Sequence, residues 1–172
     1  MGNSLFAFLF ILSISSVQGD NDTISKTCKN TKYYDLCVSS LTSNSTSLNE
    51  DPKGLAMIMV RVAITNATST NSYLSSQASS STSNGSSMKK ILKECANRYG
   101  YANEALKSSL QDLASEVYDY AYMHVMAAAD YPNACHNAFK GGLAYPSELA
   151  NREEVFKHIC DVVLGIIDNL VY

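Results

Sequence analysis

Five cysteines constrain the fold of this chain more than any other feature of its sequence. They are Cys28, Cys37, Cys95, Cys135 and Cys160. None of them forms the short C-x-x-C pair that structural zinc sites use, so the sequence predicts neither a metal site nor a bound cofactor. Cysteines that follow an uncharged amino-terminal stretch are typical of disulfides formed in the secretory pathway.

That stretch covers the first nineteen residues and predicts a cleaved signal peptide, residues 1–19. Its apolar core spans Leu5–Ile14, which is shorter than the roughly 20 residues that a membrane span needs. We therefore expect cleavage before Asp20, secretion, and no membrane association of the mature chain. Four N-x-S/T sequons agree with this route and supply the candidate glycosylation sites Asn21, Asn44, Asn66 and Asn84.

Apolar residues recur at helical spacing through most of residues 20–172, and no segment alternates as a strand would. These stripes predict long helices over 51 to about 76, 87–113, 117–139 and 147–171, and short ones over 24–28 and 33–41. Low-complexity stretches occur at 42–49 and 75–87, and the second, which is rich in serine, is predicted to be a solvated loop. Pro132 is expected to kink or break its helix. The fold class is therefore all-α, in one domain.

The positions of two cysteines can be compared with the helix pair that is expected to turn near Ser115. Cys95 and Cys135 lie twenty residues before and after that turn, so two antiparallel helices of about 30 Å bring them level at the far end of the pair. A disulfide between them is geometrically natural. Cys160 is left over, either as a buried free thiol on the last helix or as half of an intermolecular bridge.

The first two cysteines, Cys28 and Cys37, are nine residues apart. One continuous helix would separate their Cα atoms by about 13–14 Å, whereas a disulfide needs about 7 Å or less. A bridge between them therefore requires the chain to reverse around residues 29–32. The two short helices then form a hairpin that the disulfide closes.

Charge and motifs exclude several classes of function. Thirteen Lys and Arg against sixteen Asp and Glu give a net charge of −3, which excludes a dedicated nucleic-acid binder. No catalytic residues are expected, because the chain has no nucleophile elbow or phosphate loop and its three histidines lie on separate segments. His124 is predicted to be a hydrogen-bonded core or boundary residue. The adjacent carboxylates Glu153 and Glu154 are predicted to lie on a solvated helix face.

Several short segments have counterparts in a known family. Thr27–Leu41 contains C-x8-C followed by Val-Ser-Ser-Leu. Further along are the segments Asp119-Tyr120-Ala121, Met126-Ala127-Ala128-Ala129 and Cys135-x-x-x-Phe139, then an apolar last helix with a fifth cysteine. Together they resemble the plant invertase and pectin methylesterase inhibitor family, over the whole mature chain. The order of the five cysteines is the most specific part of the resemblance.

The resemblance implies an up-and-down four-helix bundle, about 51–172, preceded by a disulfide-stapled N-terminal helical hairpin, about 23–42. It also implies the disulfides Cys28–Cys37 and Cys95–Cys135. Members of the family are proteinaceous inhibitors in the cell wall or vacuole, and some are pollen or fruit allergens. The chain resembles those described as invertase inhibitors, but their Pro-Lys-Phe motif after the fourth cysteine has no counterpart in residues 139–147.

We therefore predict an inhibitor, in the apoplast or vacuole, that sterically blocks pectin methylesterase or invertase in a 1:1 complex. The candidate partner-binding residues are Lys140 and Tyr145, in the connection before the last helix. His136 is the candidate pH sensor, since histidines titrate in mildly acidic fluid. The alternative is a secreted, allergen-like binding module without inhibitory activity, such as a carrier of a small hydrophobic ligand.

Overall fold

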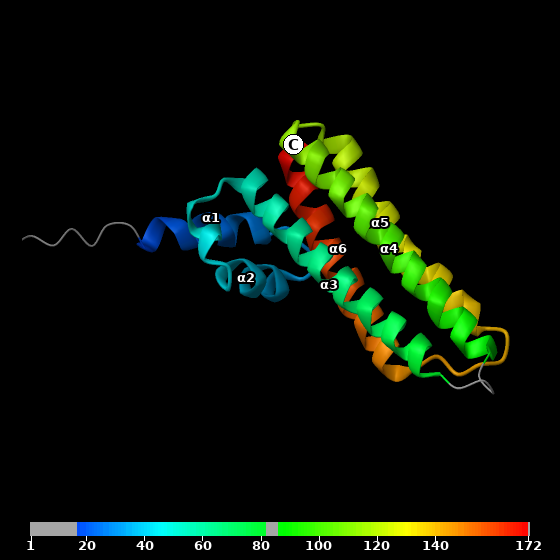
Figure 1. Ribbon diagram of the computed structural model, residues 1–172. Helices are drawn as coiled ribbons and strands as arrows, with labels where there is room; N and C mark the ends of the chain where they lie inside the picture. The colour runs from blue at the N-terminus through cyan, green and yellow to red at the C-terminus, as the bar shows by residue number, and fades with distance from the viewer. Residues whose placement is uncertain (1–16, 82–85, 172) are drawn as a thin grey trace, which may run out of the picture.

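The computed structural model in Figure 1 is a bundle of long helices with a short helical pair beside it, and it describes residues 17–81 and 86–171. Within these residues no strand occurs. The helices are α1 (Val17–Cys28), α2 (Tyr34–Thr42), the 3-10 helix η1 (Ser45–Asn49), α3 (Pro52–Ser80), α4 (Ser86–Ala114), α5 (Tyr118–Phe139) and α6 (Ser147–Val171). Residues 1–16 of the predicted signal peptide and the sequon residue Asn84 lie outside the described residues.

The four long helices form the bundle. Helix α3 packs against α4 and α6, and α5 packs against the same two helices, so the four surround one core. Short connections join successive helices, which therefore run up and down in turn. Tyr99 and Phe156, the largest fully buried side chains, meet edge to face at 5.7 Å between ring centroids. The predicted all-α bundle is confirmed.

Local sequence explains where the bundle begins. Asp51 is the N-cap of α3, and its carboxylate accepts a hydrogen bond of 2.7 Å from the backbone N–H of Gly54. Pro52 follows at the first helical position, where its missing N–H costs no intrahelical bond. Leu55 and Met59 are then fully buried one turn apart, so the helix starts with its apolar stripe already facing the core.

Both expected disulfides are present. Cys28–Cys37 joins α1 to α2 with Cα atoms 5.6 Å apart, and Cys95–Cys135 joins α4 to α5 with Cα atoms 4.7 Å apart. The chain reverses after Cys28, as the spacing required, and the resulting hairpin lies beside α3 and α6. Cys160 is a buried free thiol, and burial raises its pKa to about 12.

The hairpin approaches α6 very closely at Gly165. A Cβ atom there would lie 3.2 Å from the Cα atom of Thr31 and 3.3 Å from its Cγ2, so a glycine lets the hairpin tip seat against the helix. Asn30 adds a hydrogen bond of 3.2 Å to Asn169, and Lys32 an ion pair of 2.9 Å to Asp161. These contacts attach the hairpin to the bundle.

The structure corrects one expected helix boundary and excludes one of the two outcomes expected at Pro132. The serine-rich stretch 75–87 is mostly helical, because α3 continues to Ser80 and α4 begins at Ser86. The hydroxyls of Ser79 and Ser80 donate to the carbonyls of Ser75 and Ser76, which keeps these side chains hydrogen-bonded within the helix. Of the two outcomes expected at Pro132, a kink or a break, the break does not occur, because α5 continues to Phe139. The ring of Pro132 is buried in the bundle, where packing offsets the lost backbone hydrogen bond.

Candidate functional site

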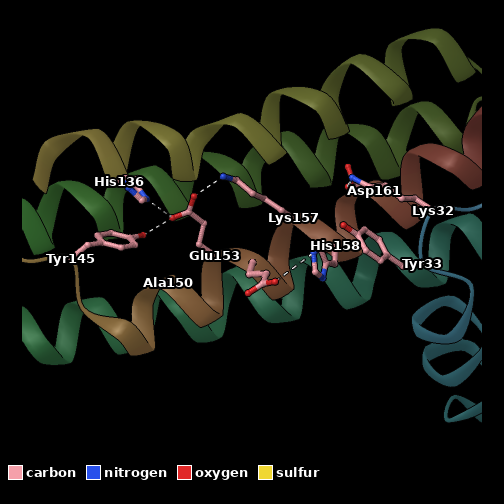
Figure 2. Close-up of a pocket in the computed structure, with 10 residues that line it drawn as sticks. Lys32, Tyr33, His136, Tyr145, Ala150, Glu153, Lys157, His158 and Asp161 are labelled. Atoms are coloured by element: carbon pink, nitrogen blue, oxygen red, sulfur yellow. Dashed lines mark hydrogen bonds and ion pairs between the residues drawn. The ribbon is translucent and has the colours of Figure 1, made fainter. Parts of the chain in front are cut away.

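A polar groove runs along α6, from the tip of the N-terminal hairpin to the connection between α5 and α6, residues 140–146 (Figure 2). Its cavity volume is about 360 Å³. The residues that line this α6 groove are Lys32, Tyr33, His136, Tyr145, Ala150, Glu153, Glu154, Lys157, His158 and Asp161. Positive and negative side chains alternate along it, so the groove is a row of ion pairs rather than an apolar ligand cavity.

Glu153 is the centre of this row. Its carboxylate accepts hydrogen bonds from Lys157 at 2.5 Å and from the hydroxyl of Tyr145 at 2.6 Å, and the Nδ1 atom of His136 lies 3.4 Å away. We call these four residues the Glu153 cluster. The side chains come from α5, α6 and the connection, so the cluster ties three segments together.

The prediction that Glu153 and Glu154 share a solvated face is wrong for Glu153. Only 7% of Glu153 is exposed, whereas Glu154 is exposed. Successive helical positions point about 100° apart, so Glu153 faces α5 and Glu154 faces solvent. Burial alone would raise the pKa of Glu153, but the hydrogen bonds from Lys157, Tyr145 and His136 outweigh burial and hold that pKa below its usual value.

Tyr145 is a support of the connection as well as a candidate contact. Its ring lies 4.3 Å from the ring of His136 and meets Phe139 edge to face at 5.0 Å. Burial and the hydrogen bond to Glu153 raise the pKa of Tyr145, so its hydroxyl stays protonated and donates. The ring is therefore held inward, whereas Lys140 is exposed at the start of the connection.

The connection also depends on a glycine. Gly142 has φ of +108°, a conformation that side-chain-bearing residues rarely adopt. Just after it, the backbone N–H of Leu143 donates to the carbonyl of Phe139 at 3.3 Å, which closes the end of α5. Lys140 lines a second hollow with His136, Glu153 and Lys157, so the Glu153 cluster separates this hollow from the α6 groove.

The other end of the α6 groove is fixed by the hairpin. Tyr33 packs on His158, with ring centroids 4.0 Å apart, and His158 lies 3.9 Å from Glu154. Lys32 reaches Asp161 at 2.9 Å, and this hydrogen bond raises the pKa of Lys32. The groove is thus bounded by two separate elements that are both docked on α6.

The remaining predicted residues lie elsewhere. His124 on α5 is 2.6 Å from Asp112 on α4, which makes it the hydrogen-bonded boundary residue that the sequence predicted. Asn44 caps η1, with its Oδ1 accepting from the Thr46 backbone N–H at 3.1 Å, and Asn66 is half-buried in the middle of α3. Glycosylation of Asn21, Asn44, Asn66 or Asn84 stays a prediction.

In the described part of the chain, no three His, Cys, Asp or Glu side chains are grouped to hold a metal ion. Within residues 17–81 and 86–171, no helix combines the length and the apolar composition that crossing a membrane requires. Fold and site therefore define a disulfide-stapled helical bundle whose groove residues bind one another. Such a site offers a rigid, charged surface for another molecule.

The family model described as plant invertase/pectin methylesterase inhibitor matches residues 22–166, so the chain belongs to this family. The family is one of protein inhibitors, and membership makes the chain an inhibitor-family protein rather than an enzyme. The match covers the hairpin and most of the bundle, including both disulfides and the Glu153 cluster.

Two curated relatives carry different target names. The chain is 48% identical over 160 residues to cell wall / vacuolar inhibitor of fructosidase 2 from Arabidopsis thaliana, covering 92% of this chain and 88% of the relative. It is 36% identical over 149 residues to pectinesterase inhibitor 28 from Oryza sativa subsp. japonica, covering 82% of this chain and 66% of the relative. Both named inhibitory activities thus occur among its relatives.

Solved structures share the fold. A mutant form of a pectin methylesterase inhibitor from Arabidopsis superposes with a TM-score of 0.69 at 24% identity, covering 84% of this chain and 95% of that one. A pectin methylesterase inhibitor from Arabidopsis thaliana gives 0.62 at 24% identity, covering 87% and 96%. At this identity the likeness concerns the helical architecture alone.

Sequence reasoning missed the Glu153 cluster, although two signals pointed to it. Glu153 lies four residues after Leu149 and three before Phe156, both fully buried, so it occupies the apolar stripe of α6. Lys157 follows four residues later, at the spacing that allows an ion pair on a helix. The contacts of Glu153 with His136 and Tyr145 depend on packing between segments.

Proposed function

We propose that this protein inhibits a plant fructosidase, an acid invertase, by covering the enzyme's substrate cleft. The observation that carries the proposal is the 48% identity, over nearly the whole chain, to a relative named as a fructosidase inhibitor. Pectin methylesterase is the second candidate target, which the pectinesterase inhibitor at 36% identity supports. Either way the inhibition is steric, because the surface is held rigid before any partner arrives.

The geometry supports the connection 140–146 as the inhibitory segment. Its shape is fixed by Tyr145 on Glu153 and by the left-handed Gly142, and the nearby disulfide Cys95–Cys135 clamps the helices behind it. Ordering a loop on binding costs free energy, so a loop that is already ordered binds more tightly for the same contacts. Lys140 is exposed and is the anchor that this segment presents.

Several further features belong to the same proposal. The protein acts in the apoplast or vacuole after removal of residues 1–19, forms a 1:1 complex and is not membrane-bound. Cleavage there would remove the first three residues of α1, which begins at Val17. His136, in the wall of the groove beside the connection, is the proposed pH sensor of complex formation.

The test is to assay the protein, purified after secretion, against an acid invertase and a pectin methylesterase at pH 5 and pH 7. We expect saturable inhibition of the invertase at pH 5. If only pectin methylesterase is inhibited, invertase is excluded as the target and pectin methylesterase replaces it. Inhibition of neither enzyme at either pH contradicts it. His136→Gln should flatten the pH profile, and an unchanged profile would exclude His136 as the sensor.

A further inference from the structure

A second surface lies at the end of the bundle opposite the connection, where α5 begins and α6 ends. A hollow of about 240 Å³ between these two helices is lined by Tyr118, Asp119, Tyr122, Met123, Ile167, Asp168 and Val171. We call it the distal groove. It is smaller than the roughly 300–1,000 Å³ typical of small-molecule sites, and its size fits one side chain of a partner.

Exposed apolar side chains are concentrated in the two segments that form the distal groove, and two of them, Met123 and Val171, line it. Nine large apolar side chains are exposed among the described residues, and five of them lie at the start of α5 or the end of α6. They are Val117, Tyr120, Met123, Met126 and Val171, each between 40% and 61% exposed. Methionine and tyrosine are enriched at protein interfaces, so this concentration marks a contact surface rather than scattered exposure.

The charged residues of the distal groove indicate the kind of partner that would bind there. Asp119 and Asp168 are exposed on its rim, and within the described residues neither carboxylate has an ion-pair partner. None of the residues that line the groove is basic, and Lys53 at this end of the bundle is bound to Glu116 at 2.7 Å. The rim is therefore acidic and lacks a cation of its own.

Asp168 is the more informative of the two. An acidic residue in the first turn of a helix, such as Asp119 in α5, is favoured by the helix dipole. Asp168 lies in the last turn of α6, where the dipole disfavours a negative charge, and that turn contains no basic residue. Its position therefore weakens the free protein, and a cation brought by a partner would remove that unfavourable interaction.

We propose that the distal groove binds a lysine or arginine side chain of a partner protein, presented next to an apolar residue. The aliphatic stem packs on the exposed side chains of Met123 and Val171, and the cationic head lies between Asp119 and Asp168, close to the rings of Tyr118 and Tyr122. Aromatic faces attract cations, as carboxylates do. The tyrosines and the aspartates of the groove therefore favour the same occupant, a cationic side chain. The surface is independent of the connection 140–146.

The probe is acetyl-Leu-Arg-Leu-amide, titrated into the full protein while the methyl groups of its methionines are followed by NMR. The control peptide is acetyl-Leu-Glu-Leu-amide. We expect a saturable shift of the Met123 methyl, with Met88 at the start of α4 unmoved, and at least tenfold weaker binding of the control peptide. The double substitution Asp119→Asn with Asp168→Asn should weaken binding of the arginine peptide at least tenfold. The control Asp35→Asn, at an exposed position on α2, should leave that binding unchanged.

A second readout separates binding from folding. Because the charge of Asp168 opposes the dipole of α6, Asp168→Asn alone should raise the midpoint of thermal unfolding by about 1–4 °C. The same substitution should weaken binding of the arginine peptide. Three results overturn the proposal: equal shifts with both peptides, unchanged binding by the doubly substituted protein, or no shift of Met123 up to about 10 mM peptide. A shift of Met123 with protein concentration alone also overturns it, since a second copy of the chain would then cover the groove.

Discussion

The two ends of the bundle differ in whether their carboxylates have bonding partners within the chain. At the connection end, Glu153 is buried and its carboxylate binds Lys157, Tyr145 and His136 of the same chain. At the distal end, Asp119 and Asp168 stay exposed beside uncovered apolar side chains. Charges that are satisfied internally make a surface rigid, whereas unsatisfied ones make it available. One small fold can therefore present a rigid surface at one end and an uncovered, charged surface at the other.

The largest expected effect comes from removing the disulfide behind the connection. Cys95→Ser with Cys135→Ser should lower the free energy of unfolding by about 2–4 kcal/mol, because this bridge closes a loop of 40 residues. Guanidinium unfolding measures the loss. Hydrogen exchange should show the connection opening before the distal end.

The matched control is the other disulfide. Cys28→Ser with Cys37→Ser opens a loop of only nine residues, so the loss should be about 1 kcal/mol smaller. An equal or larger loss in this control would show that the long bridge is not what holds the connection end.

Breaking the Glu153 cluster should have the next largest effect. Glu153→Gln keeps the shape of the side chain but leaves Lys157 without its charged partner, which should cost about 1–3 kcal/mol. The neighbouring Glu154→Gln is the control, since it is exposed and should change the free energy of unfolding by less than about 0.5 kcal/mol. Similar values for the two variants would mean that burial of Glu153 does not matter to the fold.

The free energy of unfolding of the wild type and of Glu153→Gln should depend differently on pH. The folded-state pKa of Glu153 lies below the unfolded value of about 4.5, so its ionised form stabilises the fold above that pH. The stability difference between wild type and Glu153→Gln should therefore be present at pH 7 and pH 5 and should shrink as the pH falls below about 4. Urea unfolding at pH 7, 5 and 3 measures it. A difference that grows toward pH 3 contradicts the assignment.

The smallest effect on stability is expected at Tyr145. Tyr145→Phe keeps the ring against His136 and Phe139 but removes the hydrogen bond to Glu153, which should cost about 0.5–1.5 kcal/mol. Tyr101→Phe is the control, because the Tyr101 side chain is 52% exposed and should change little. If both substitutions leave thermal unfolding unchanged, Tyr145 does not hold the connection.

Much of the fold could be predicted from local sequence. Helical spacing and the Asp51 cap predicted the long helices, because both depend on residues close in sequence. The cysteine intervals agreed, by simple helix geometry, with the stapled hairpin and the two disulfides that the family resemblance implied. The end of α3 was predicted too early, since serine hydroxyls can bond back to helix carbonyls as well as to turns. Composition alone does not decide between these two outcomes.

The candidate site was predicted less well. The connection 140–146 was identified from its place after Cys135, but the inward orientation of Tyr145 requires knowing that Glu153 lies beneath it. That contact joins two segments whose distance depends on how α5 and α6 pack. The distal groove likewise requires the start of α5 and the end of α6 to lie side by side, which no single segment encodes.

We propose above that the connection end is the inhibitory face of the molecule. The inhibition constant against acid invertase at pH 5, measured for Lys140→Ala with Tyr145→Ala, tests this proposal. The control is Lys29→Ala with Tyr34→Ala, which removes the same residue types from exposed positions of the hairpin. Lys140→Ala alone serves as a variant that leaves the Glu153 cluster intact.

We predict a rise of about tenfold or more in the inhibition constant for the connection variant, equal to about 1.4 kcal/mol of binding free energy, and a smaller rise for Lys140→Ala alone. The hairpin control should inhibit like the wild type. Unchanged inhibition by both connection variants, or an equal loss in the control, would contradict the claim.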